Sequence, residues 1–154
     1  MAAYFLDSSA LVKRYVIETG TARVRRLTHR QAGHVIFVAR ITAVEVTAAV
    51  ARRRKGGKPT PAKASSLLHR FRQHLAGRYA AVAVTPALLD DAMRLANAHS
   101  LRAYDAVQLA AALEVQRQRQ ATGFTPLTLI SADKELNDAA TAEGLAVENP
   151  NSHP

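Results

Sequence analysis

The chain has no cysteine and comparatively few acidic residues. Without Cys it cannot form a disulfide, a thiolate metal site or a Cys nucleophile, which is compatible with a reducing cytosol. Its 154 residues contain no apolar run near the roughly 20 residues that cross a bilayer. The N-terminus, Met1–Asp7, lacks the basic stretch of a signal peptide and reaches a carboxylate early. We therefore expect a soluble, cytoplasmic protein with no membrane partner.

Acidic residues are outnumbered by basic ones. Twelve Asp and Glu face 21 Lys and Arg, so the formal net charge is +9. Sixteen of these cations are Arg, whose planar guanidinium suits phosphate oxygens, and nucleic acid is the first partner to consider. Because a GC-rich genome also enriches Arg, the charge alone leaves this partner open. A basic loop is predicted at Arg52–Pro59.

Short apolar strands alternate with helices along the chain. The predicted strands are Tyr4–Leu6, Val35–Ala39, Tyr79–Val84, Leu127–Ile130 and Ala146–Glu148. The helices between them include Ala10–Val16, Ile41–Arg54, Ala103–Gln118 and Asp133–Glu143. This alternation predicts an α/β fold with three layers, α/β/α, around a central, mostly parallel sheet of about five short strands. We expect one domain over residues 1–150 and a flexible tail over 151–154.

Four acids are expected at one edge of this sheet. Asp7, Glu45, Asp105 and Asp133 each follow a strand or lie in the first turns of a helix. Parallel sheets bind ligands outside the carboxyl ends of their strands. Carboxylates gathered there repel one another unless a cation lies between them. A ligand set of oxygen alone favours Mg²⁺ or Mn²⁺ over Zn²⁺.

Each acid also has a purely local explanation, and the sequence leaves both readings open. Asp7 can cap the following helix, although Ser8-Ser9 offers two other caps. The segment Thr42–Glu45 fits a capping box. Asp105 and Asp133 are favourable charges at the positive ends of their helices.

Four segments resemble, in order, the motifs of PIN-domain nucleases. They are Leu6–Lys13, Ile41–Glu45, Tyr104–Ala110 and Ser131–Leu136. The resemblance runs from residue 4 to 150. In length and layout the chain is most similar to the VapC-type toxins of prokaryotic toxin–antitoxin pairs.

The resemblance implies a metal-dependent endoribonuclease, the toxin of a type II pair. Asp7, Glu45, Asp105 and Asp133 would coordinate one or two Mg²⁺ or Mn²⁺ ions, and a metal-activated water would hydrolyse RNA phosphodiesters. Ser9 and Ser131 would not bind the metal themselves but would orient the carboxylates that do. The implied partners are RNA, a cognate antitoxin and a second copy in a homodimer. RNA or antitoxin would contact the basic side chains of Arg52, Arg53, Arg54, Lys55 and Lys58, unless these are simply solvated.

Three other functions are considered. The protein could act mainly as the toxin half of a complex, holding an antitoxin whose basic tail fills the acidic groove, which is compatible with nuclease activity in the free state. A catalytically inactive module that binds nucleic acid or an antitoxin would share the same fold. A phosphatase that uses Asp7 as its nucleophile is disfavoured, because position 9 is Ser rather than Asp. Apolar side chains at Leu67, Leu68 and Phe71 fit a dimer contact and a core position equally well.

Overall fold

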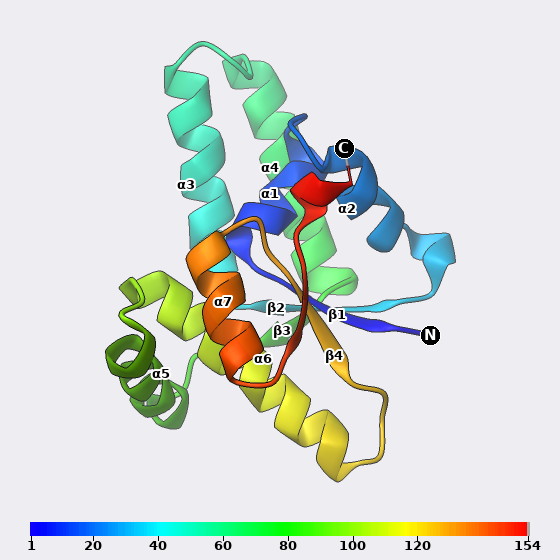
Figure 1. The fold of residues 1–154 in the computed structure, drawn as a ribbon. Coiled ribbons are helices and arrows are strands. Elements are labelled where there is room, and N and C mark those ends of the chain that lie inside the picture. Colours follow the sequence, from blue (N-terminus) through cyan, green and yellow to red (C-terminus); the bar gives the residue numbers. More distant parts are fainter. Residues whose placement is uncertain (154) are drawn as a thin grey trace.

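The computed structural model describes residues 1–153 and is organised around a five-stranded sheet (Figure 1). All pairings between neighbouring strands are parallel, and their order in space is β3-β2-β1-β4-β5. The first strand of the chain therefore lies in the middle of the sheet. The strands are β1 (Ala3–Leu6), β2 (Val35–Ala39), β3 (Ala80–Val82), β4 (Leu127–Ile130) and β5 (Ala146–Glu148).

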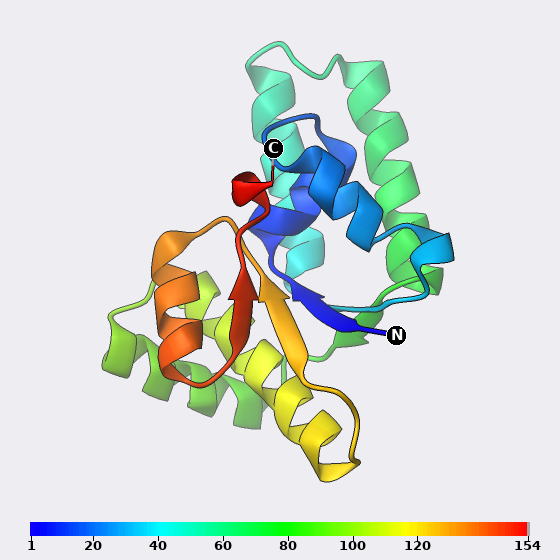
Figure 2. The same ribbon diagram turned by 45° about the vertical axis from the view of Figure 1, so that its right-hand side comes forward.

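Helices cover both faces of this sheet, which confirms the predicted three-layer α/β/α architecture (Figures 1 and 2). One layer contains α1 (Ser8–Tyr15), α2 (Thr21–Leu27), α3 (Thr42–Lys55) and α4 (Pro61–Gly77). The other contains α5 (Pro86–His99), α6 (Ala103–Ala121) and α7 (Lys134–Ala142). There are two 3-10 turns: η1 (Arg30–Ala32) lies between α2 and β2, and η2 (Pro150–Ser152) follows β5.

The two central strands anchor both halves of the core. Because successive side chains of a strand point to opposite faces, Phe5 and Leu129 pack against α5–α7, whereas Leu6 and Ile130 pack against α1–α4. Leu6 is paired in register with Ile130. The amide of Asp7 then donates to the carbonyl of Ile130 at 3.2 Å. The carboxyl ends of β1 and β4 are thus held side by side by buried residues.

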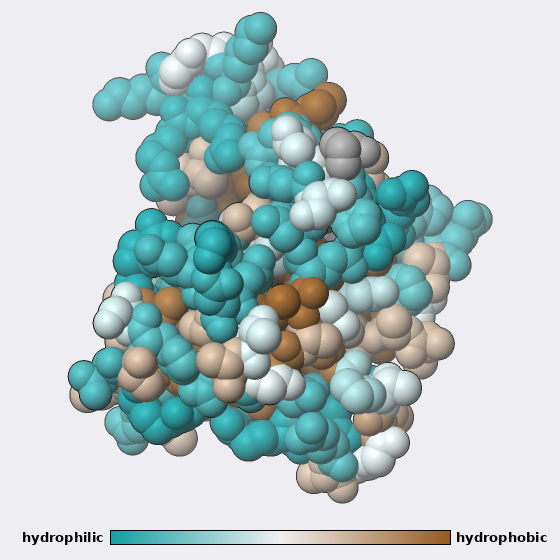
Figure 3. All heavy atoms as spheres, viewed as in Figure 1, coloured by the Kyte–Doolittle hydropathy of each residue, from teal (hydrophilic) through white to brown (hydrophobic). Residues whose placement is uncertain are grey.

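The sheet also separates charge. Residues 19–89, which include α2, α3 and α4, contain 14 Lys and Arg against one acid, Glu45. Residues 90–148, which include most of α5 and all of α6 and α7, contain five Lys and Arg against nine acids. Hydrophilic side chains cover most of the face shown in Figure 3. One helical layer is therefore strongly basic, and the opposite layer is weakly acidic.

Two segments differ from their predicted form. Arg52–Lys55 are not a loop: they form the last turn of α3, where cations offset the negative end of the helix dipole. Only Gly56–Thr60 connects α3 to α4, and Lys58 lies there. The tail expected over 151–154 begins inside η2, whose Pro150 is buried. Pro154 lies outside the described residues.

The apolar side chains considered for a dimer contact belong largely to the core. Phe71 is 1% exposed, and Leu67 and Leu68 are half-buried against the same cluster. Within residues 1–153, no helix combines the length and the apolar character that crossing a bilayer requires.

Candidate active site

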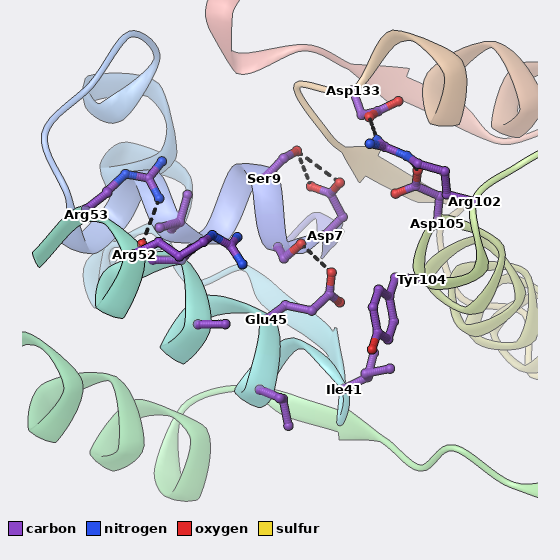
Figure 4. A pocket seen from close by; sticks show the side chains of 15 residues that line it. Asp7, Ser9, Ile41, Glu45, Arg52, Arg53, Arg102, Tyr104, Asp105 and Asp133 are labelled. Atoms are coloured by element: carbon purple, nitrogen blue, oxygen red, sulfur yellow. Dashed lines mark hydrogen bonds and ion pairs between the residues drawn. The ribbon is translucent and has the colours of Figure 1, made fainter. Parts of the chain in front are cut away.

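A cavity of about 690 Å³ opens at the carboxyl ends of the central strands. Its walls come from α1, α3, the start of α6 and the loop that follows β4 (Figure 4). All four predicted carboxylates line this cavity, with the polar and basic residues around them: Asp7, Ser8, Ser9, Glu45, Arg52, Arg53, Arg102, Tyr104, Asp105 and Asp133. Residues remote in the chain are therefore brought to one place.

Asp7 is the most deeply buried of these acids, with 2% of its surface exposed. Its carboxylate accepts hydrogen bonds from the Ser9 hydroxyl at 2.8 and 2.9 Å, the Ala10 amide at 2.9 Å and the Ser131 hydroxyl at 2.8 Å. Burial raises the pKa of Asp7 to about 6, although these donors oppose the shift and the charge of Asp105 adds to it. Asp7 thus holds a negative charge at a considerable electrostatic cost.

Capping and cavity lining coexist in two of the acids. Asp7 is the N-cap of α1, and Asp133 is the N-cap of α7, where one of its oxygens accepts from the Leu136 amide at 2.9 Å. The other Asp133 oxygen accepts from Arg102 instead. Ser8 and Ser9, which the sequence also offered as caps, do not cap α1; Asp7 does. Each of these carboxylates therefore uses one oxygen to start a helix and has a second oxygen for other contacts.

The capping box predicted at Thr42 and Glu45 does not form. Thr42 is the first helical residue of α3, and its hydroxyl accepts from the Gln108 amide at 2.8 Å. Glu45 is held instead by Ser8, at 2.9 Å, and by Gln108, at 2.7 Å. These contacts come from α1 and α6, so tertiary packing turns Glu45 toward the cavity.

Asp105 and Asp133 share one arginine. Arg102 donates through Nε to Asp105 at 3.1 Å and through Nη2 to Asp133 at 2.7 Å (Figure 4). Burial raises the pKa of Asp105, the charge of Asp133 raises it further, and Arg102 lowers it. The Arg102 side chain is itself 73% exposed, whereas those of Asp105 and Asp133 are 15% and 21% exposed.

Ser9 and Ser131 join the ends of two neighbouring strands. While both hydroxyls donate to Asp7, the Ser9 oxygen accepts from the Ala132 amide and the Ser131 oxygen from the Asp133 amide, each at 3.0 Å. Asn137 donates to the Ser131 carbonyl at 2.8 Å. The position of Asp7 is therefore tied to the same turn that carries Asp133.

Sequence reasoning missed three side chains that contact these acids: Ser8, Gln108 and Arg102. Gln108 is 1% exposed and lies one turn after Asp105 on the same face of α6. The signal for it was a lone polar residue inside the uncharged stretch Ala106–Ala112. For Arg102 the signal was its spacing of three residues before Asp105, which is a helical neighbour distance.

The basic residues divide into two groups. Arg52 and Arg53 line the cavity, and Arg53 also pairs with Glu18 at 2.9 Å. Arg54, Lys55 and Lys58 are exposed beyond it, toward the end of α3. The acidic cavity thus lies beside a basic wall.

The four carboxylates are suitable ligands for a hard divalent cation, but their present spacing is too wide to hold one. All four offer oxygen ligands. The pKa values of Asp7 and Asp105 are raised, and a bound cation would lower them by favouring the charged form. Among residues 1–153, however, no three Asp, Glu, His or Cys side chains converge closely enough to hold a metal ion. The donor set therefore fits a hard divalent cation in its chemistry, while Arg102 contacts two of the four acids.

We predict that Asp7→Asn stabilises the metal-free protein at pH 7.5. Because the folded pKa of about 6 exceeds the ordinary 3.8, the contribution of Asp7 to stability is highest below pH 4 and is lost as the pH rises through 6. Asn cannot ionise, so the variant should lack this loss, which is worth up to about 3 kcal/mol. Urea unfolding in EDTA at pH 4.5 and 7.5 measures the difference. The exposed Asp138→Asn is the control, and equal pH dependence in wild type and Asp7→Asn would contradict the assignment.

Comparisons with known proteins agree with this arrangement. The fold is similar to PAE2754 from Pyrobaculum aerophilum, with a TM-score of 0.65 and 21% identity over 99% of this chain and 92% of that one. It is also similar to FitAcB from Neisseria gonorrhoeae, with a TM-score of 0.60 and 22% identity over 96% and 97% of the two chains. VapBC2 from Rickettsia felis, bound to a DNA fragment from its promoter, gives 0.60 and 15% over 96% and 98%.

No curated protein matches the sequence significantly. The PIN domain family, in contrast, matches residues 4–142, which include most of β1, all of β2, β3 and β4, and all four carboxylates. With a match over most of its length and a parallel sheet that gathers the expected acids, the chain belongs to the PIN domain family.

Proposed function

We propose that this protein is a metal-dependent endoribonuclease and the toxin of a type II toxin–antitoxin pair. One observation carries the proposal: Asp7, Glu45, Asp105 and Asp133 line a single cavity, although each comes from a different part of the chain. Membership of the PIN domain family supports nuclease chemistry. The products expected from the resemblance are a 5′-phosphate and a 3′-hydroxyl.

In this proposal the four carboxylates hold Mg²⁺ or Mn²⁺. When bound, such a cation supplies an acidified water at neutral pH and shields negative charge that develops on the phosphate. Ser9 and Ser131 keep Asp7 oriented from behind, and Gln108 and Ser8 do the same for Glu45. Because these donors are neutral, they fix the carboxylates without cancelling their charge.

The basic end of α3 is the proposed contact for the RNA backbone. Arg52 lies in the cavity wall, and Arg54, Lys55 and Lys58 continue from it as exposed cations. The excess of Lys and Arg in residues 19–89 supports an approach of RNA from this layer rather than across α5–α7.

A cognate antitoxin is the proposed protein partner, with a basic segment that fills the acidic cavity. The similarity of the fold to FitAcB and to VapBC2 supports this partner. A homodimer stays a prediction, and the half-buried Leu67 and Leu68 offer it little free apolar surface.

We predict that Asp7→Asn reduces Mn²⁺-dependent RNA cleavage by at least about 100-fold, because a ligand charge is lost while the fold is kept. Gel analysis of an end-labelled RNA with Mn²⁺ or EDTA measures the rate. Asp90→Asn, on the exposed side of α5, should cleave as the wild type does. Full activity of Asp7→Asn would reject the site.

We also predict a steep salt dependence of RNA binding through α3. In an Asp7→Asn background, which prevents cleavage, each lost phosphate contact should reduce the slope of log K against log salt by about 0.7. Replacing Arg52, Arg54, Lys55 and Lys58 with Gln should therefore flatten the slope by about 2 to 3. The control replaces Arg94, Arg117 and Lys134, cations of the opposite layer, and an equal effect there would contradict the proposed path.

A catalytically inactive module that binds nucleic acid or an antitoxin is the second candidate. The specific observation in its favour is that Arg102 occupies two carboxylates and that no closed metal group forms among residues 1–153. Calorimetric titration with Mn²⁺ separates the two candidates, because an inactive module would show neither metal binding nor cleavage.

A further inference from the structure

Arg102 is the one cation, within residues 1–153, that contacts any of the four carboxylates. Asp7 and Glu45 are bound by neutral donors that the fold holds in place. One oxygen of Asp105 and the second oxygen of Asp133 contact instead a single long side chain at the cavity mouth, while Asp133 also caps α7 through the Leu136 amide. The site is thus divided into a fixed half and a half whose charge is balanced by a side chain that can move.

The oxygens that Arg102 contacts are the ones that a metal would need. One oxygen of Asp133 already accepts from the Leu136 amide. The other oxygen, which accepts from Arg102 at 2.7 Å, is therefore the one left to bind a metal. Asp105 is bonded by Nε of the same guanidinium at 3.1 Å. A divalent cation placed between these carboxylates would lie within a few ångströms of the guanidinium charge, and like charges at that distance repel strongly.

Nothing in the local structure prevents Arg102 from leaving. Its backbone is extended at the N-cap of α6, and its side chain makes no capping hydrogen bond there. Its side chain is 73% exposed, so it moves into water without opening the core. Exposed ion pairs of this kind are individually weak.

We propose that Arg102 is an internal counter-ion that the divalent metal displaces from Asp105 and Asp133. Resting on the proposed function, this makes Arg102 a positioning residue: it holds the two carboxylates together without metal and sets the metal concentration at which the site fills. Its removal then tightens metal binding instead of weakening it.

The test compares Mn²⁺ affinity by isothermal titration calorimetry at pH 7.5 in wild type, Arg102→Gln and Arg102→Lys. Arg102→Gln should bind Mn²⁺ about three- to tenfold more tightly, because two exposed ion pairs no longer compete. Arg102→Lys should lie between the two, since a compact ammonium cannot contact both carboxylates in the same fork. The rise in melting temperature at a fixed Mn²⁺ concentration gives a second readout, and melting in EDTA checks the fold.

Two matched variants separate displacement from a general change of charge. Arg52→Gln removes one positive charge from the same cavity, yet Arg52 forms no ion pair with any acid of residues 1–153. Arg94→Gln removes an arginine that bridges Asp91 and Glu143 on the outer surface in the same manner. Both should change Mn²⁺ affinity less than about twofold, since neither holds a proposed ligand.

The outcomes are distinct. Wild type that binds Mn²⁺ and an Arg102→Gln variant within twofold of it would overturn the inference and leave the nuclease proposal intact. Equal tightening in Arg52→Gln would also overturn it, because the effect would then be the overall field. If wild type binds no Mn²⁺, the nuclease proposal and the displacement both fail.

Discussion

The burial of a carboxylate at the end of the central strand is the constraint around which this site is arranged. Asp7 is 2% exposed, and burial opposes its ionisation. Its charge is tolerated because Ser9, the Ala10 amide and Ser131 donate to it. Since Ser131 follows β4 and Ser9 lies in α1, these donors meet only when β1 and β4 are neighbours. The order of strands in the sheet is therefore a condition for the electrostatics of the site.

Helix capping is part of this site. Asp7 and Asp133 each satisfy a backbone amide that the first turn of a helix leaves without a partner. A carboxylate has two oxygens, and the one engaged by the amide fixes the direction of the other. Capping therefore leaves each carboxylate a second oxygen, which in Asp7 accepts from Ser9 and Ser131 and in Asp133 accepts from Arg102. For these two acids, helix capping and a place in the cavity wall coexist.

Prediction from the sequence is least accurate for features that depend on contacts between two secondary-structure elements. The strands Val35–Ala39 and Leu127–Ile130 were predicted with the correct first and last residues. Short apolar runs of this kind, bounded by residues that end them, are typical of buried strands. The edge strand was predicted as Tyr79–Val84 but spans Ala80–Val82. This strand lies at the edge of the sheet and pairs with β2 alone. Few hydrogen bonds therefore define where it begins and ends.

The carboxylates and their contacts were predictable to different degrees. The position of Asp7 follows from the strand that precedes it, whereas the orientation of Glu45 does not. Local rules assign Glu45 to a capping box, but Gln108 on α6 takes the Thr42 hydroxyl and bonds Glu45 as well. A competition between a local and a long-range partner is decided by packing, which a single sequence does not display.

The distribution of charge links metal binding to RNA binding in the proposed function. An acidic cavity repels phosphate, while the basic wall that begins at Arg52 attracts it. RNA that follows this wall meets unfavourable charge at the carboxylates until a divalent cation balances them. The cation therefore favours RNA, and by thermodynamic reciprocity RNA favours the cation. Because Arg102 pairs with two of the acids, the metal-free cavity already carries part of that balance. In the proposed displacement, a doubly charged ion would replace this single exposed positive charge beside the proposed path of the RNA.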